Sequence, residues 1–180
     1  MKRGRFSVVR FSSKRDIKKV VSEIKDLYAK TLTHHLEDYP LSSEELDQVE
    51  KELLTIADPD LITLLRYDGR IIGYVFGFAD ISRTLHINRG RLSPLSILRI
   101  LTALKRSDKI LFNGMGILPE YQRLGGNALL YRELEHIVSK RSFKEIEMVQ
   151  ISEKTELMIA DAQSLGAKPF KIHRMYMIPV

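Results

Sequence analysis

The 180-residue sequence contains no cysteine. This absence excludes disulfide bonds, thiolate metal ligands and a cysteine nucleophile, and it weakly favours a reducing compartment. No apolar run approaches the ~20 residues that a membrane-spanning helix needs. The basic N-terminal sequence "MKRGRFSVVRF" also lacks the continuous apolar segment of a signal peptide. From these absences we predict a cytoplasmic protein without a membrane span.

Acidic residues are in the minority. The chain has 29 Lys and Arg against 23 Asp and Glu, a formal net charge of +6. A basic balance suits polyanions such as nucleic acid, anionic lipid or a phosphate-rich cofactor, but it also serves solubility alone. No basic motif interleaved with aromatic residues indicates nucleic-acid binding, and no histidine has the neighbours of a metal site, so neither nucleic acid nor metal is expected.

The pattern of apolar residues predicts alternating strands and helices without repeats or linkers, and therefore a single domain over residues 1–180. Capping pairs Ser13/Asp16 and Ser42/Glu45 mark two helix starts, and Asp68-Gly69 marks a tight hairpin. The predicted strands are 5–11, two within 60–81, 109–118, 144–152 and one or more within 168–180; the predicted helices are 12–35, 42–57, 93–109, one following the glycine pair, and 154–166. This order predicts a mixed β-sheet with helices on both faces, in the α/β or α+β class.

Two of these segments are unusually apolar. The helix at 93–109 is apolar nearly all round, which suits a buried helix, an apolar groove or a membrane surface, and we expect a buried helix. The strand at 109–118 is almost continuously apolar, as in strands that are buried on both faces at the centre of a sheet.

The stretch "LPEYQRLGGNALL" (118–130) leads from this strand into a helix through two adjacent glycines. A helix start offers unpaired N–H groups and a partial positive charge, and glycine allows a phosphate to approach the backbone. The stretch is neither a Walker loop nor a dinucleotide-binding fingerprint. Taken alone, the glycine pair is equally compatible with a plain turn.

In its context, the stretch resembles the acyl-coenzyme A pyrophosphate loop of the GNAT N-acyltransferase superfamily. The matching residues are Ile117, Pro119, Gln122 and Gly125, with Asn127 where the family has Gly or Ala. A register one residue later, with Arg123, Gly126 and Ala128, fits the final position but lengthens the spacing from the proline. We prefer the first register, because its proline spacing fits and because asparagine tolerates left-handed geometry. The predicted order of elements is also similar to the whole GNAT topology.

The resemblance implies transfer of an acyl group, usually acetyl, from a coenzyme A thioester to an amine. It implies a backbone N–H at about Gly116 to Leu118 that polarises the thioester. The cofactor-binding residues that it implies are Ile117, Leu118, Gln122, Arg123, Leu124, Gly125, Gly126, Asn127 and Ala128.

The acid and base of the family are not matched. Ala162 stands where many members have a tyrosine acid, Thr155 stands near a usual asparagine, and no carboxylate lies on the strand at 109–118. The substitutes that we name are Glu153, which follows a strand, and Tyr176, on a late strand. Helix capping or a first-turn role is the favoured interpretation for Glu153, and packing is the favoured one for Tyr176.

Three functions follow as hypotheses. The first is an N-acetyltransferase that uses acetyl-CoA as co-substrate, with a small-molecule or peptide amine as acceptor. Its variant uses a longer acyl donor, as acyl-CoA or on an acyl carrier protein, which a basic surface would suit. The second is a non-enzymatic acyl-CoA-binding module, and the third is nucleic-acid binding. An apolar C-terminal strand that pairs across an interface would make a homodimer.

Overall fold

The computed structural model describes residues 6–32, 42–89, 91, 93–149 and 151–174. The chain divides into two compact units, residues 1–149 and residues 150–180. The single domain over residues 1–180 remains a prediction. Among the described residues, no helix is both long and apolar enough to cross a membrane.

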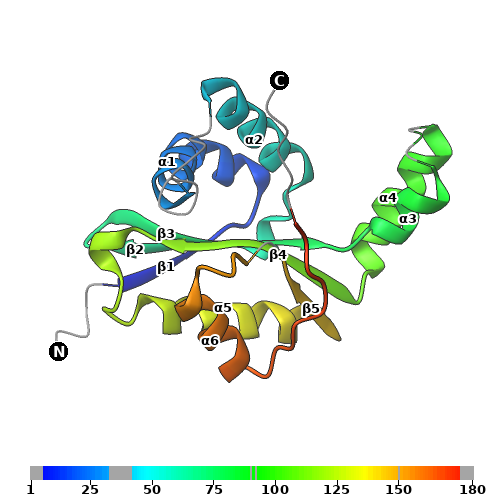
Figure 1. Cartoon of the computed structure of the whole chain (residues 1–180). Coiled ribbons are helices and arrows are strands. Elements are labelled where there is room, and N and C mark those ends of the chain that lie inside the picture. Colours follow the sequence, from blue (N-terminus) through cyan, green and yellow to red (C-terminus); the bar gives the residue numbers. More distant parts are fainter. Residues whose placement is uncertain (1–5, 33–41, 90, 92, 150, 175–180) are drawn as a thin grey trace, which may run out of the picture. The chain divides into compact units, whose positions relative to one another are not determined.

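A five-stranded sheet forms the centre of the first unit (Figure 1). Its strands lie in the order of the sequence; they are β1 (Phe6–Arg10), β2 (Ile62–Tyr67), β3 (Arg70–Ala79), β4 (Lys109–Ile117) and β5 (Glu145–Met148). The first four pair antiparallel, and β4 pairs parallel with β5. The predicted mixed sheet is confirmed, and the strand predicted at 5–11 forms β1 at one edge of the sheet.

Helices lie on both faces of this sheet, as predicted. Helices α1 (Lys14–Leu32) and α2 (Ser43–Ile56) lie on one side, and α5 (Gly126–Arg141) lies on the other (Figure 1). The apolar face of α1, which includes Ile17 and Ile24, is buried in the core. The apolar face of α5, which includes Leu130 and Ile137, is buried as well. These amphipathic patterns therefore direct each helix onto the sheet.

The helix caps and the hairpin turn form at the residues that the sequence predicts. Ser13 Oγ accepts the N–H of Asp16 at 3.3 Å and donates to its carboxylate at 2.7 Å. Ser42 and Glu45 form the reciprocal pair that defines a capping box. At the hairpin between β2 and β3, Asp68 has φ 49° and Gly69 has φ 85°, the two positive values that a tight turn of this kind requires.

The helix predicted at 93–109 forms as α4 (Pro94–Arg106), but it is not buried. Leu95, Leu98 and Leu101 are exposed. A short helix that the sequence pattern missed, α3 (Ser82–Ile87), precedes it. The structure buries Ser96 of α4 and leaves these leucines in solvent. The prediction of a buried helix is wrong.

Strand β4 also differs from its prediction. Ile110 and Phe112 are buried, whereas Leu111 is only half-buried and Asn113 is exposed, so this stretch is not buried on both faces. The pairing of β4 with β3 shifts register between Phe76 and Gly77, which places Asn113 as an extra residue in β4. Such a bulge bends a strand and re-aims the residues that follow it.

The second unit contains α6 (Glu156–Ser164). Gly166 has φ 86°, its N–H donates to the Gln163 carbonyl, and the N–H of Ala167 donates to the Ala162 carbonyl. These are the two hydrogen bonds of a glycine-ended helix terminus, so the predicted closure at Gly166 is confirmed. Residues 168–174 form no strand, contrary to prediction, and the rest of that predicted strand lies outside the described residues.

Candidate functional site

The candidate site begins where β4 ends. After Leu118, residues Pro119–Tyr121 form one 3₁₀ turn, and the N–H of Tyr121 donates to the Leu118 carbonyl at 2.9 Å. Arg123 then has φ 60° and Gly125 has φ 90°. Two left-handed residues so close together reverse the chain and deliver it directly into α5, as the glycine pair in the sequence indicated.

The two glycines serve different purposes. At Gly125 a side chain would meet nothing within 4 Å, so this position is a glycine because of its positive φ and leaves open space over the turn. At Gly126 an added Cβ would lie 2.8 Å from Leu65 Cδ2 and 3.0 Å from Ile117 Cδ1. Gly126 is therefore required for close packing of the start of α5 against β2 and β4.

The start of α5 offers unpaired hydrogen-bond donors. Gly125 occupies the N-cap position, and no side chain caps the helix. Within the described part of the chain, the N–H groups of Gly125, Gly126 and Asn127 have no hydrogen-bond partner. Exposed Arg123 adds a cation next to them. Free N–H groups at the positive end of a 16-residue helix are donors of the kind that suit an anion.

The structure adds two details to the predicted loop. Gln122 Nε2 donates to the Ile117 carbonyl at 3.1 Å and so ties the turn to β4, and its role in cofactor binding stays a prediction. Asn127, whose tolerance of left-handed geometry favoured the first register, lies in the first turn of α5 and is not among the residues with positive φ. Arg123 and Gly125 adopt that geometry instead. Leu118 is buried, Leu124 and Ala128 are exposed, and none of the three has a side chain that could bind an anion.

The far edge of β4 supplies a further donor. Leu118 N–H donates to the Ile72 carbonyl at 2.9 Å, so it is not free to polarise a ligand. In an antiparallel pair, alternate residues direct their N–H groups to the partner strand. With Leu118 bonded to β3, the N–H groups of Met115 and Ile117 point away from β3. On that side β5 pairs with β4 only over Lys109–Phe112.

Among the backbone N–H groups of Gly116 to Leu118, the N–H of Ile117 is therefore the free one, and the sequence could not identify it. It has no hydrogen-bond partner among the described residues, and Ile117 lies against Gly126 at the start of α5. The sequence located this group only within Gly116 to Leu118. Choosing among the three required the strand register, which no motif in the sequence encodes.

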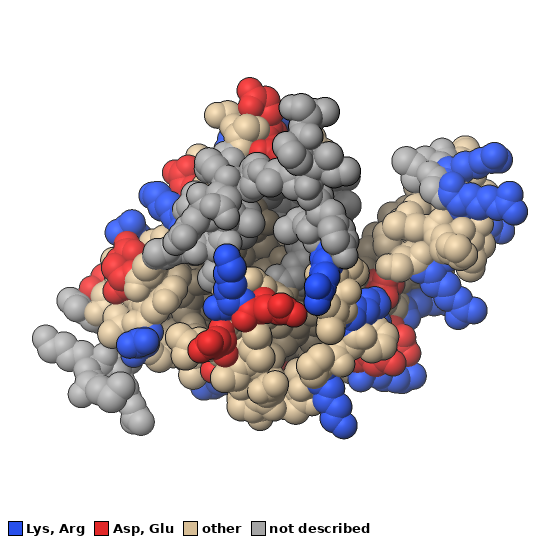
Figure 2. Space-filling view, viewed as in Figure 1, with Lys and Arg blue, Asp and Glu red and all other residues tan. Residues whose placement is uncertain are grey.

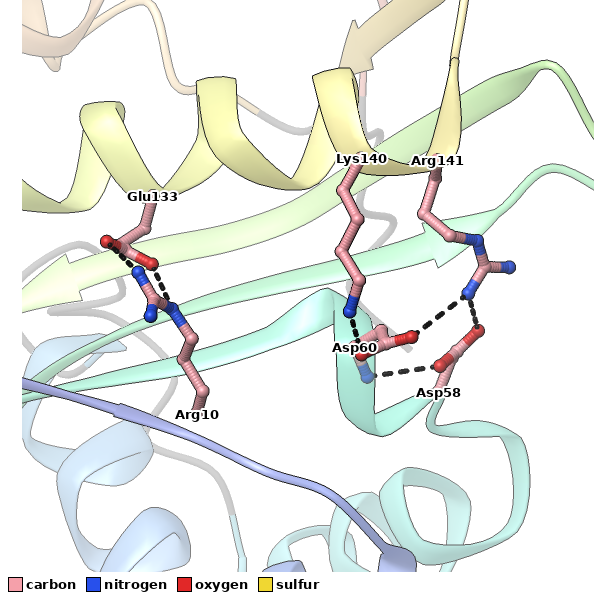
Figure 3. Close-up of polar contacts among 6 residues, drawn as sticks. All are labelled: Arg10, Asp58, Asp60, Glu133, Lys140 and Arg141. Carbon is pink, nitrogen blue, oxygen red and sulfur yellow. Dashed lines mark hydrogen bonds and ion pairs between the residues drawn. The ribbon is translucent and has the colours of Figure 1, made fainter.

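Ion pairs hold α5 in place at its middle and at its C-terminal end (Figure 3). Halfway along the helix, Arg10 of β1 donates two hydrogen bonds to the carboxylate of buried Glu133, at 2.7 and 2.8 Å. This contact raises the pKa of Arg10. At the C-terminal end, Lys140 and Arg141 bind Asp60 and Asp58, both at 2.9 Å. The turn that presents the free N–H groups is thus attached to a fixed helix.

A buried tyrosine packs behind β4 on the opposite face. Tyr74 lies 3.1 Å from Thr31, hydroxyl to hydroxyl, and its ring stacks on Phe76 at 4.5 Å. A Cβ at Gly116 would lie 3.0 Å from the Tyr74 ring and 3.2 Å from Thr31, so this glycine lets α1 approach β4. Burial raises the pKa of Tyr74 to about 12, which keeps the phenol protonated at neutral pH.

The proposed substitutes for the acid and base gain no support from contacts. Glu153 lies in an exposed turn that precedes α6, and it is neither the N-cap, which is Thr155, nor a first-turn residue. Tyr176 lies outside the described residues. Ala162, at the place of the family's tyrosine, is buried and has no group that could transfer a proton. The roles of Glu153 and Tyr176 stay predictions.

Comparison with known proteins places this geometry in context. No family model matches the sequence. The chain is 24% identical over 161 residues to Protein YghO of Escherichia coli (strain K12), an alignment that covers 85% of this chain but only 41% of YghO. The chain thus spans less than half the length of that relative.

Solved structures are similar over nearly the whole chain. A possible acetyltransferase from Clostridium difficile 630 has a TM-score of 0.60 at 13% identity, with 98% of each chain covered. The aminoglycoside N-acetyltransferase AAC(6')-Iy, in complex with CoA, has a TM-score of 0.58 at 15% identity, with 100% of this chain and 99% of that chain covered. The chain therefore has the GNAT acetyltransferase fold, and the resemblance stated from the sequence is confirmed at the level of the fold.

Proposed function

We propose that this protein is an N-acyltransferase that takes an acyl group from acyl-coenzyme A, in the simplest case acetyl-CoA, and transfers it to an amine. The observation that carries the proposal is the pairing of two features. A left-handed glycine turn opens onto the uncapped start of α5, and the free edge of β4 ends beside it at Ile117. The acetyltransferases of similar fold support the same reaction class.

The turn fits a pyrophosphate in its chemistry. The N–H groups of Gly125, Gly126 and Asn127 would donate to phosphate oxygens, and Arg123 would add a positive charge. The open space over Gly125 admits a phosphate that a side chain would displace. Gln122, through its bond to the Ile117 carbonyl, would hold the turn in the binding geometry without touching the ligand.

Ile117 N–H would act on the reacting carbonyl. Acyl-CoA supplies a thioester, whose carbonyl oxygen gains negative charge when a neutral amine attacks the carbonyl carbon. A fixed backbone donor stabilises that charge without reorganisation. The C–S bond then breaks, the amide forms, and the thiolate takes up a proton. Because Ala162 supplies no acid, we infer that this proton comes from solvent or from the acceptor itself.

The test is a calorimetric titration of acetyl-CoA into the native chain and into Gly125→Asp. We expect micromolar-range binding by the native protein. In the variant it should be lost, because a carboxylate then occupies the place of a phosphate. Gly69→Asp is the matched control: Gly69 also has a positive φ and also has nothing within 4 Å of an added Cβ, but it lies in the β2–β3 hairpin. It should keep the affinity while suffering the same backbone strain.

Turnover is measured by the thiol that the reaction releases. Because the chain has no cysteine, a thiol reagent detects only coenzyme A. Release that depends on an added amine supports the enzyme. Binding without release for any amine in a panel of aminoglycosides, polyamines and peptides would favour the non-enzymatic binding module. A folded native protein that binds neither acetyl-CoA nor a longer acyl-CoA would overturn the proposal.

A further inference from the structure

Strands β3 and β4 are antiparallel neighbours that a turn of about two to five residues would join. Instead, residues 81–107 form an insertion that contains α3 and α4, here called the arm. Its base is closed, since Asp80 N–H donates to the Lys109 carbonyl at 2.9 Å. The pairing of β3 with β4 therefore does not depend on the arm. A function of the arm would lie in the surface that it presents to other molecules.

The arm is an ordered element with its own hydrogen bonds. Ser93 caps α4, accepting from the N–H of Ser96 at 3.2 Å, and Pro94 begins the helix. Arg99 of α4 contacts the Asn88 side chain at the end of α3, at 3.4 Å. Ser96, on the inner side of α4, is buried. The outward side of α4 is therefore held in one orientation.

That outward side is apolar. Leu95, Leu98 and Leu101 are 58%, 61% and 53% exposed. Their spacing of three residues places them along one side of the helix. Exposed Ile97 and, on α3, Leu85 and Ile87 extend the apolar surface. A protein rarely leaves so many large aliphatic side chains together in water unless another phase or molecule covers them.

The charges of the arm are all of one sign. Between Asp80 and Asp108 the sequence has no acidic residue, and its cationic side chains are Arg83, Arg89, Arg91, Arg99, Lys105 and Arg106. Within the described residues none of them forms an ion pair with an acid. Figure 2 shows the arm, at the right of the view, with uncharged side chains along its length and basic side chains at its outer end.

We propose that the arm docks on an anionic lipid surface, with its leucines inserted among the acyl chains and its arginines on the lipid phosphates. Exposed aliphatic residues and cations without acids are the combination that holds a short helix in the plane of a membrane interface. A protein partner is less favoured, because protein interfaces are enriched in Tyr, Trp, Phe and Met as well as in Arg. Of these residue types, residues 81–107 contain Arg alone. This inference goes beyond the proposed activity and does not depend on it.

The test is co-sedimentation of the full chain with vesicles of phosphatidylcholine alone or mixed equally with phosphatidylglycerol. We expect binding to the mixed vesicles that weakens with added salt. The double variant Leu98→Asp and Leu101→Asp should lower the partition coefficient on the order of a hundredfold. Arg89→Gln together with Arg91→Gln should lower it roughly thirtyfold. The control Leu157→Asp removes a leucine of α6 that is 68% exposed, and it should bind as the native chain does.

Other outcomes would overturn the proposal. The arm would not be a lipid-docking element if the native chain failed to bind anionic vesicles, or if the double leucine variant bound them with the native partition coefficient. If sedimentation velocity showed a dimer of the native chain that the leucine variant dissociates, the apolar side would be an interface between two copies. If only an acidic carrier protein bound the arm, its partner would be a protein. Circular dichroism confirms that each variant is folded.

Discussion

At the scale of single residues, adjacent glycines show how one residue type can meet two separate requirements. Gly125 supplies a backbone conformation and Gly126 supplies the absence of volume. Their roles therefore separate on substitution. A change at Gly125 should act on ligand binding, whereas a change at Gly126 should act on the packing between α5 and the sheet.

Gly126→Ala tests the second role. In an ordinary helix position this change stabilises by about 1 kcal/mol. Here the new Cβ would lie 2.8 Å from Leu65 Cδ2, so we expect the free energy of unfolding to fall by about 1–3 kcal/mol. Urea unfolding measures it, and Asn127→Ala, at the next and exposed helix position, is the control with little expected change. A stability equal to or above the native value would show that α5 has room to shift.

At the scale of elements, α5 and α1 both bury an apolar face, but their polar contacts differ. Helix α5 is also held by ion pairs at its middle, where Arg10 contacts Glu133, and at its C-terminal end, where Lys140 and Arg141 contact the acidic turn before β2. Helix α1 is held by apolar contacts and by the buried hydroxyl pair of Thr31 and Tyr74. The second attachment predicts a pH dependence of stability at alkaline pH.

Tyr74 should destabilise the fold above pH 10. In the unfolded chain its pKa is about 10, whereas burial raises the folded-state pKa to about 12. Between these values the unfolded state loses the proton first, so stability present below pH 10 is lost as the pH rises, by up to about 3 kcal/mol. Burial also raises the pKa of Tyr28, which adds a loss of the same sign.

Urea unfolding at a series of pH values from neutral to alkaline measures this loss, and Tyr74→Phe is the control. The variant should be less stable at neutral pH by about 1 kcal/mol, because the hydrogen bond with Thr31 is gone. It should also lose less stability between pH 10 and 12 than the native protein. Parallel curves for the two proteins would mean that Tyr74 does not titrate as its burial requires.

At the scale of the whole molecule, the net charge of +6 bears on the proposed co-substrate. A basic protein attracts a phosphate-rich ligand over a distance that salt shortens. We expect the affinity for acetyl-CoA to fall severalfold as ionic strength rises. Acetylpantetheine, which lacks the pyrophosphate, should bind weakly and with little dependence on salt. Equal salt dependence for the two ligands, measured by calorimetry, would argue against phosphate contacts at the start of α5.

The sequence by itself determined the order of the strands of the sheet and of the main helices, and the glycine turn before α5. Helix caps at Ser13 and Ser42, the turn at Asp68-Gly69 and the helix end at Gly166 are formed by residues within a few positions of one another. The glycine turn before α5 is equally local. Such features are predictable because their hydrogen bonds and dihedral angles depend on neighbouring side chains alone.

The tertiary structure decided what depends on distant residues. It exposed the leucines of α4 and buried Ser96, and it directed Gln122 to the Ile117 carbonyl. It also selected the free N–H of Ile117 over that of Leu118. That choice follows from the register of β4 against β3. Pairing between strands is set by contacts far apart in the chain, and a shift of one residue exchanges the bonded and the free groups.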